Sequence, residues 1–220
     1  MMVYGAVNHA VLDRIPNTAK RVLDLGCGNG ALGHALKARQ AAEVTGVTFS
    51  AEEVSHARSA LDRVEQADLE TAEFTGFGSF DCVVASHVLE HVRDPVTVLQ
   101  RVRACLEPGG VLVVALPNAL HYRQRLEFLA GRFRYTDGGI MDRTHYRFFD
   151  WDTARGLVAD AGFELVSAEA EGGFPGSRFL GPAKTRLDSF ATLRFPALLG
   201  VQFLMRARPV VPYTNNGTPG

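Results

Sequence analysis

Hydrophobic residues gather in short runs that alternate with longer amphipathic segments between positions 21 and 116. The runs predict buried strands at about 21–25, 43–47, 64–67, 81–85 and 111–116. The amphipathic segments, with one more after the last of these strands, predict helices at about 30–39, 51–62, 95–105 and 152–161. Strands that alternate with helices are typical of a parallel sheet covered by helices, so the pattern predicts an α/β fold.

The pattern changes over residues 117–150, where regular aliphatic spacing gives way to arginine, histidine, glycine and aromatic residues. We interpret this stretch as an insertion that faces a substrate. Two later apolar segments, 163–170 and 201–207, predict a further pair of strands. We expect residues 1–208 to form a single domain and residues 209–220, which contain Pro, Asn, Thr and Gly, to form a flexible tail.

Composition narrows the classes of protein that fit. The 220 residues are 46% hydrophobic and 21% charged, which supports one substantial core. A formal net charge of −1 gives no global field for nonspecific nucleic-acid binding. Cys27, Cys82 and Cys105 lack CxxC spacing, and no segment approaches the roughly 20 apolar residues of a membrane span. We therefore expect reduced thiols, no membrane span, no leader and a soluble, cytoplasmic protein.

A run from Arg21 to Gly30 carries the strongest local motif. It is a short apolar strand that ends on an acid and continues into three alternating glycines before a helix. Glycines let the backbone turn sharply and approach a ligand, and the helix start offers unpaired N–H groups. The motif predicts a nucleotide-binding turn. Because Gly26, Gly28 and Ala31 also fit the GxGxxA dinucleotide fingerprint, a nicotinamide-dependent oxidoreductase remains an alternative.

Three motifs together resemble the class I S-adenosylmethionine-dependent methyltransferases. They are LDLGCGNG at 23–30, FDCVVASHVLEHV at 80–92 and LEPGGVLVV at 106–114, and they lie at fitting intervals. The resemblance implies S-adenosyl-L-methionine as cofactor and S-adenosyl-L-homocysteine as product. It also implies a Rossmann-like three-layer sandwich with a seven-stranded, mostly parallel sheet whose last strand runs antiparallel.

Further motifs in the insertion, GRFRY at 131–135 and GIMDRTHYRFF at 139–149, resemble a bacterial subgroup. That subgroup is associated with glycosyltransferases and surface-polysaccharide synthesis. The resemblance implies O-methylation of a saccharide or a related small metabolite. A non-catalytic, methyltransferase-like regulatory partner is the alternative in another class.

The family resemblance also assigns cofactor contacts. Asp24 would orient the glycine loop or reach the cofactor's ammonium group. Relatives usually place an acid after the second strand to accept both ribose hydroxyls, whereas this chain has Thr48, so hydroxyls, water or backbone would hold the ribose. Ser50 is expected to cap a helix in a capping box with Glu53. The expected cofactor-binding residues are Asp24, Leu25, Gly26, Cys27, Gly28, Gly30, Thr48, Phe49, Ser50, Ala67, Asp68, Leu69, Ser86 and His87.

Methyl transfer from a sulfonium is an in-line displacement, so the protein mainly positions the nucleophile and excludes water. A sugar hydroxyl stays protonated near pH 7, and a general base would accelerate its reaction by about 10²–10⁴. The candidate bases are His145, His121 and His91. We favour His145, since Asp142 and Arg143 lie near it in the polar insertion. A structural role is the alternative for each.

Arginines recur through the insertion between aromatic residues. Guanidinium groups fork onto phosphate and aromatic faces stack on sugars or bases, so this mixture favours a phosphorylated or nucleotide-linked saccharide. A solvated lid or the interface of a homodimer is the alternative. The expected substrate-binding residues are Tyr122, Arg123, Arg143 and Arg147.

The spelling His87-x-x-Glu90-His91 matches the inverted zinc-protease motif, which would put two histidines on one helical face. We do not expect a hydrolase, because the segment stands where the methyltransferase pattern has its own Leu-Glu-His. Some related enzymes bind a divalent ion there through Glu-x-x-Glu-His, but His87 replaces the first acid and makes a magnesium site less natural. We expect no resident metal.

Overall fold

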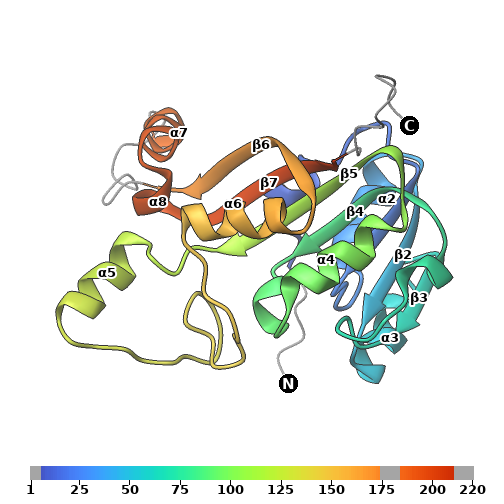
Figure 1. Ribbon diagram of the computed structural model, residues 1–220, viewed down its shortest axis with the longest axis horizontal. Helices are drawn as coiled ribbons and strands as arrows, with labels where there is room; N and C mark the ends of the chain where they lie inside the picture. Colours follow the sequence, from blue (N-terminus) through green and yellow to red (C-terminus); the bar gives the residue numbers. More distant parts are fainter. Residues whose placement is uncertain (1–5, 174–183, 211–220) are drawn as a thin grey trace, which may run out of the picture.

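The computed structural model describes residues 6–173 and 184–210, which hold one seven-stranded sheet in the order β3-β2-β1-β4-β5-β7-β6 (Figure 1). The first five strands pair in parallel, whereas β7 runs antiparallel to both β5 and β6. The expected α/β fold and the antiparallel last strand are confirmed. The strands are β1 (Arg21–Leu25), β2 (Glu43–Thr48), β3 (Arg63–Gln66), β4 (Phe80–Ser86), β5 (Leu106–Pro117), β6 (Phe163–Gly172) and β7 (Gly200–Pro209).

Helices cover the sheet and also extend past one end of it (Figure 1). The helices are α1 (His9–Leu12), α2 (Ala31–Arg39), α3 (Ala51–Ala57), α4 (Pro95–Arg103), α5 (Tyr122–Leu129), α6 (Trp151–Asp160), α7 (Lys184–Arg194) and α8 (Pro196–Leu199), with 3-10 turns η1 (Phe74–Phe77) and η2 (Leu89–His91). The prediction of a helix over 51–62 was wrong in its end, because the chain turns after Ala57 to place Leu61 in the core. The hydrophobic pattern gave no prediction of α5, α7 or α8.

The core has two halves, one on each face of the sheet. Along β5, residues 112, 114 and 116 join the cluster that packs with α4 and α6, whereas residues 111, 113 and 115 join the cluster that packs with α1 and α2. Burial on both faces explains the uninterrupted apolar run of this strand. Strand β5 is irregular near its start: Gly109 has φ 79°, and the pairing of β4 with β5 shifts register between Phe80 and Cys82.

The insertion of residues 117–150 begins and ends at neighbouring points. Asn118 and Phe149 form an isolated bridge, and the Ala119 amide donates to the Phe149 carbonyl at 2.9 Å. The buried Asn118 side chain donates to the carbonyls of Ala197 and Gly200 at 3.0 and 2.7 Å, which ties the insertion to α8 and β7. Helix α5 buries none of its side chains and lies apart from the sheet (Figure 1).

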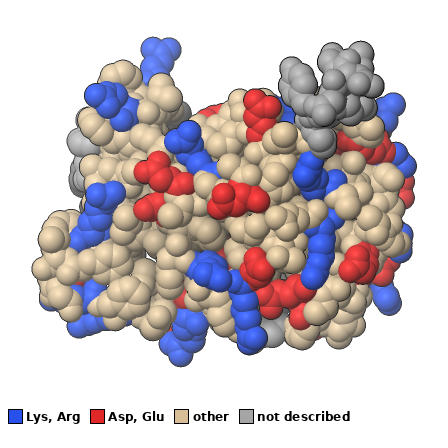
Figure 2. All heavy atoms as spheres, in the orientation of Figure 1, with Lys and Arg blue, Asp and Glu red and all other residues tan. Residues whose placement is uncertain are grey.

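Basic and acidic side chains are interspersed over the face in Figure 2. In the described parts of the chain, no helix has the length and apolar character needed to cross a bilayer. Strand β7 runs through Pro209, and residues 211–220 of the expected tail lie outside the described residues.

Candidate active site

The glycine loop after β1 lies across the end of β2. The amides of Gly26 and Cys27 both donate to the Val47 carbonyl, at 2.8 and 3.0 Å. Gly26, Gly28 and Gly30 have φ of 68°, 52° and 83°. A Cβ on Gly26 would lie 2.5 Å from Val88 Cγ2, so this position has room only for glycine. Gly30 is the N-cap of α2, so the loop leads directly into a helix start.

Asp24, at the end of β1, is only 3% exposed, and burial raises the pKa of its carboxyl to about 7. The next buried group, the Cys27 thiol, has its pKa raised by burial and further by the negative charges of Asp24 and Glu53. The thiol is therefore a packing group. Among the residues that the structure describes, no cation forms an ion pair with this carboxyl, and such a buried acid fits a ligand that carries an ammonium group at this place.

The end of β2 meets the segment after β3. The Ala67 amide donates to the Thr48 carbonyl at 3.0 Å, which brings the predicted residues at 48–50 and 67–69 to one edge. Phe49 is 76% exposed, Asp68 is exposed and Leu69 is buried. This edge therefore offers an apolar ring and an acid to a ligand.

The predicted capping box at α3 is only half present. The Ser50 hydroxyl accepts the Glu53 amide at 3.4 Å and caps the helix. The Glu53 carboxylate, however, accepts the hydroxyl of the buried Thr48. The structure thus places an acid at the end of β2, on the helix and not on the strand.

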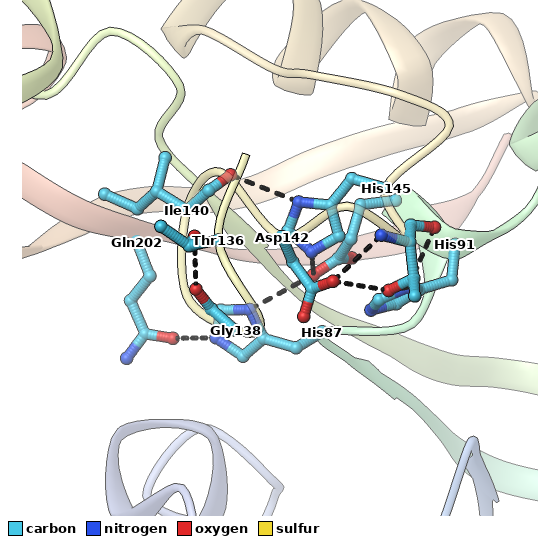
Figure 3. A network of polar contacts seen from close by, with 10 residues as sticks. His87, His91, Thr136, Gly138, Ile140, Asp142, His145 and Gln202 are labelled. Carbon is cyan, nitrogen blue, oxygen red and sulfur yellow. Dashed lines mark hydrogen bonds and ion pairs between the residues drawn. The ribbon is translucent and has the colours of Figure 1, made fainter. Parts of the chain in front are cut away.

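Beyond β4, which ends at Ser86, His87 adopts a left-handed φ of 52° (Figure 3). Its Nε2 lies 2.7 Å from Gln202 Oε1, and its Nδ1 lies 3.3 Å from Glu90 Oε1. Gln202 donates its own amide to Glu171, so its oxygen faces His87. Burial lowers the His87 pKa, but the Glu90, Gln202 and Glu171 oxygens outweigh it and raise the pKa overall. His87 therefore keeps its second proton to a higher pH than an ordinary histidine, and in that form both nitrogens donate.

Two of the three predicted bases, His91 and His145, lie next to each other in this network of polar contacts (Figure 3). The His91 and His145 rings pack edge to face with centroids 4.7 Å apart. His145 Nδ1 lies 3.1 Å from the Ile140 carbonyl, so this nitrogen carries the proton and Nε2 keeps its lone pair. The His145 pKa is lowered, chiefly by burial, so the ring is neutral at pH 7.

Glu90 lies between these histidines and is 1% exposed. Its Oε1 is 4.0 Å from His145 Nε2, and its Oε2 has no hydrogen-bond partner among the described residues. Its carbonyl accepts the amides of Tyr146 and Arg147 at 2.8 and 3.1 Å, which docks the insertion on η2. The Arg147 guanidinium donates to the Arg93 carbonyl at 2.9 and 2.6 Å, so it supports this docking.

The third predicted base, His121, lies apart from this pair. It lines a cleft of about 460 Å³ whose walls include Arg123, Arg134 and Ile140. Burial lowers the pKa of His121, and the nearby charge of Arg123 adds to the effect. Ile140 connects the two places, because it lines the cleft and its carbonyl holds His145.

The other predicted substrate residues lie at or near the surface. The Tyr122 ring packs on His121 with centroids 4.4 Å apart, and its hydroxyl accepts Arg123 Nε at 3.1 Å. Arg143 pairs with Asp137 at 2.8 Å, both exposed. Of the predicted substrate residues, Arg123 is the one that lines the cleft.

The residues that could bind a cation differ from those of the His87-x-x-Glu90-His91 motif in the sequence. One oxygen or nitrogen from each of Glu90, His91 and His145 lies within 4.8 Å of the others. His87 instead turns to Gln202, because its left-handed φ precedes a three-residue 3-10 turn and no α-helix forms there. Two imidazoles and one carboxylate are ligands that suit zinc better than magnesium.

Comparisons with known proteins agree with the fold. A family model described as "Methyltransferase domain" matches residues 5–168. A ubiquinone biosynthesis O-methyltransferase of Psychrobacter arcticus is 34% identical over 124 residues, 52% of this chain and 48% of that protein. One from Histophilus somni is 37% identical over 111 residues, 46% of each chain. The match thus spans about half the length of these curated relatives.

Solved structures resemble the chain over more of its length. A SAM-dependent methyltransferase from Archaeoglobus fulgidus superposes with a TM-score of 0.62 at 19% identity and covers 87% of this chain and 86% of that one. An S-adenosylmethionine-dependent methyltransferase from Mesorhizobium loti gives a TM-score of 0.62 at 22% identity, over 94% of this chain and 100% of that one. At such identities the likeness supports the fold alone.

Proposed function

The chain belongs to the methyltransferase domain family, and from this premise we propose that it transfers the methyl group of S-adenosyl-L-methionine to a hydroxyl group. The observation that carries the proposal is the buried Asp24 beside a loop of left-handed glycines. A carboxylate in that setting pairs well with the ammonium of an amino-acid cofactor, and the glycines leave space for its backbone-like end. This donor set fits the cofactor.

When bound, S-adenosyl-L-methionine supplies a methyl group activated by a positive sulfur. The chain's own residues would bind and orient it: Asp24 would hold the ammonium group, and Ser86 with His87 would border the methionine portion. Phe49 and Asp68, at the outer edge, would contact the adenine ring. The insertion, which docks on η2 through the Glu90 carbonyl, would help to exclude water from the reacting atoms.

His145 is the general base in this proposal. Its Nε2 lone pair accepts the proton of the acceptor hydroxyl, and the Glu90 carboxylate, 4.0 Å away, stabilises the resulting imidazolium. The contact of Nδ1 with the Ile140 carbonyl fixes the tautomer that this step needs. His91 packs against the ring of the base. His121 lines the cleft and would contact the acceptor there.

The acceptor that the cleft favours is a hydroxyl of a phosphorylated or nucleotide-linked saccharide. Arg123 and Arg134 supply guanidinium groups for phosphate, and Glu127 in the same wall supplies an acceptor for sugar hydroxyls. This acceptor class agrees with a role in surface-polysaccharide synthesis.

A second candidate is the hydroxyl of a quinone-type intermediate. It is favoured by relatives named for ubiquinone biosynthesis, at 34% and 37% identity over about half of the chain. A phenolic hydroxyl with a pKa near 10 ionises more readily than a sugar hydroxyl, so it depends less on the base.

A transfer assay with radiolabelled S-adenosyl-L-methionine tests the proposal. One panel holds nucleotide sugars and sugar phosphates, and a second holds catechols and hydroxyquinols. Label in the first panel that falls in Arg123→Ala supports the saccharide acceptor, and label only in the second selects the quinone-type candidate. No binding of S-adenosyl-L-homocysteine at millimolar concentration would exclude methyl transfer.

A further inference from the structure

Glu53 supplies the carboxylate that the end of β2 lacks. We infer that this side chain, which the Thr48 hydroxyl holds in place, accepts the two ribose hydroxyls of the cofactor. The inference rests on the proposed function and names a residue for the part of the cofactor that Thr48 alone does not explain.

The first step is the position of Glu53. It lies in the first turn of α3, five residues after the strand end, and its side chain is half-buried. The Cys27 thiol in the glycine loop has its pKa raised by the charge of Glu53 as well as by that of Asp24. The two acids therefore both lie close to the loop, Asp24 at the end of β1 and Glu53 beside the end of β2.

The second step is the direction of the carboxylate. In a full capping box it would accept the Ser50 amide, but that amide points to the Thr48 hydroxyl at 3.4 Å. The Thr48 hydroxyl in turn donates to Glu53 Oε2. Thr48 is 3% exposed, so this relay is fixed inside the protein. Helix capping therefore does not use the carboxylate.

The third step is the number of hydrogen bonds that the Glu53 carboxylate can still accept. A carboxylate has about four lone-pair positions, and Thr48 occupies one of them. The other oxygen, Oε1, accepts no hydrogen bond within residues 6–173 and 184–210. Two vicinal hydroxyls are donors that a single carboxylate takes together.

The fourth step is the geometry of the fold. Ligands of open α/β sheets bind beyond the carboxyl ends of the strands, near the point where the strand order reverses. With its ammonium at Asp24, an extended nucleoside cofactor would lie from the end of β1 toward the end of β2, its neighbour in the sheet. Its sugar would then lie beside the Thr48–Glu53 pair, and its base would lie toward Phe49 and Asp68.

Isothermal titration of S-adenosyl-L-homocysteine tests this assignment without an acceptor or turnover. The ligands are the natural compound and its 2′-deoxy and 3′-deoxy analogues. The variants are Glu53→Gln, which keeps the shape and removes the charge, and Thr48→Val, which frees the carboxylate. Glu52→Gln, one residue earlier on the same helix and exposed, is the matched control.

We expect Glu53→Gln to weaken binding of the natural ligand by about 10- to 100-fold, because two charge-assisted hydrogen bonds are weakened. Thr48→Val should weaken it less, and Glu52→Gln should leave it within about two-fold. The deoxy analogues should bind the wild-type protein more weakly than the natural ligand does. Glu53→Gln should then reduce the affinity for these analogues only slightly. This loss of additivity separates a ribose contact from a general effect on folding.

Equal binding of the natural ligand by wild type and Glu53→Gln would overturn the inference and leave methyl transfer standing. So would a full loss in Glu53→Gln for ligands without ribose hydroxyls. No binding by the wild-type protein at millimolar ligand would instead overturn the proposed function, and the inference with it.

Discussion

Replacement of Asp24 by asparagine should make the free protein more stable and its cofactor binding weaker. Asp24 is fully enclosed, and burial raises the pKa of its carboxyl from 3.8 to about 7. Between these pH values the folded chain keeps a proton that the unfolded chain releases. Raising the pH through this window therefore lowers the free energy of unfolding, and above pH 7 the loss is complete.

The magnitude follows from the size of the shift. About three pKa units correspond to about 4 kcal/mol at pH 8, and about 1.5 kcal/mol of that is already lost at pH 5. Asparagine has the same shape and no charge, so Asp24→Asn should gain up to about 4 kcal/mol at pH 8. For a domain of this size the gain is on the order of 10 °C in Tm.

Urea unfolding of the free protein at pH 5 and pH 8 measures the effect. The advantage of Asp24→Asn over wild type should grow by about 2–3 kcal/mol between these pH values. Asp160→Asn, an exposed acid at the end of α6, is the control and should change stability by less than about 0.5 kcal/mol at either pH.

Calorimetry of the same variants with S-adenosyl-L-homocysteine gives the second half of the result. Wild-type affinity should rise as the pH passes about 7, because only the ionised carboxyl pairs with the ligand's ammonium, and Asp24→Asn should lose this dependence. A stability difference that is the same at pH 5 and pH 8 would refute the burial argument. Unchanged affinity in the variant would refute the ammonium contact.

Three further predictions concern His145, the cluster of Glu90, His91 and His145, and the glycine loop. His145→Ala should lower turnover by about 10² or more and leave cofactor affinity within a few-fold, and an unchanged rate would contradict the assignment. Since burial lowers the pKa of His145, the wild-type rate should reach its plateau at a lower pH than an ordinary histidine base would give. The proposed reaction needs no metal, so EDTA should leave turnover unchanged. Zn²⁺ should inhibit, because it would bind the lone pairs of His145, His91 and Glu90. Activity that depends on an added divalent ion would contradict the metal-free reaction. Gly26→Ala should lower both Tm and cofactor affinity. The φ of 68° is unfavourable for alanine, and the new Cβ would lie 2.5 Å from the Val88 side chain. A variant with wild-type Tm would disprove the steric argument.

Local sequence was enough to predict the strands and the glycine loop, whereas the antiparallel last strand of the sheet was implied by the family resemblance. Strand β1 and the three glycines lie in ten consecutive residues, and the left-handed φ of each glycine is a property of that residue type. Ser50 could be predicted as a helix cap for the same reason. The direction of the Glu53 carboxylate could not, because the tertiary contact with Thr48 competes with a capping bond of similar energy.

The histidine network could not be predicted from spacing. His91 and Thr144 are 53 positions apart, and Gln202 joins His87 from a distance of 115 positions. The only sequence feature that marks Gln202 is its polar side chain within an apolar strand. Preference for His145 over His121 rested on its flanking charges, whereas the structure supports it by a different feature, the fixed tautomer next to Glu90.

The bridge between Asn118 and Phe149 has an evolutionary consequence. Since the two ends of the insertion meet there, the thirty residues between them can be exchanged as a cassette while the strands keep their register. The cassette carries the cleft arginines and His145, and the sheet edge retains Asp24, Thr48 and Glu53. With the roles proposed above, the insertion would set the choice of acceptor and the sheet edge the binding of the donor, so grafting residues 119–148 onto a related scaffold is expected to transfer the acceptor preference and to leave donor binding unchanged.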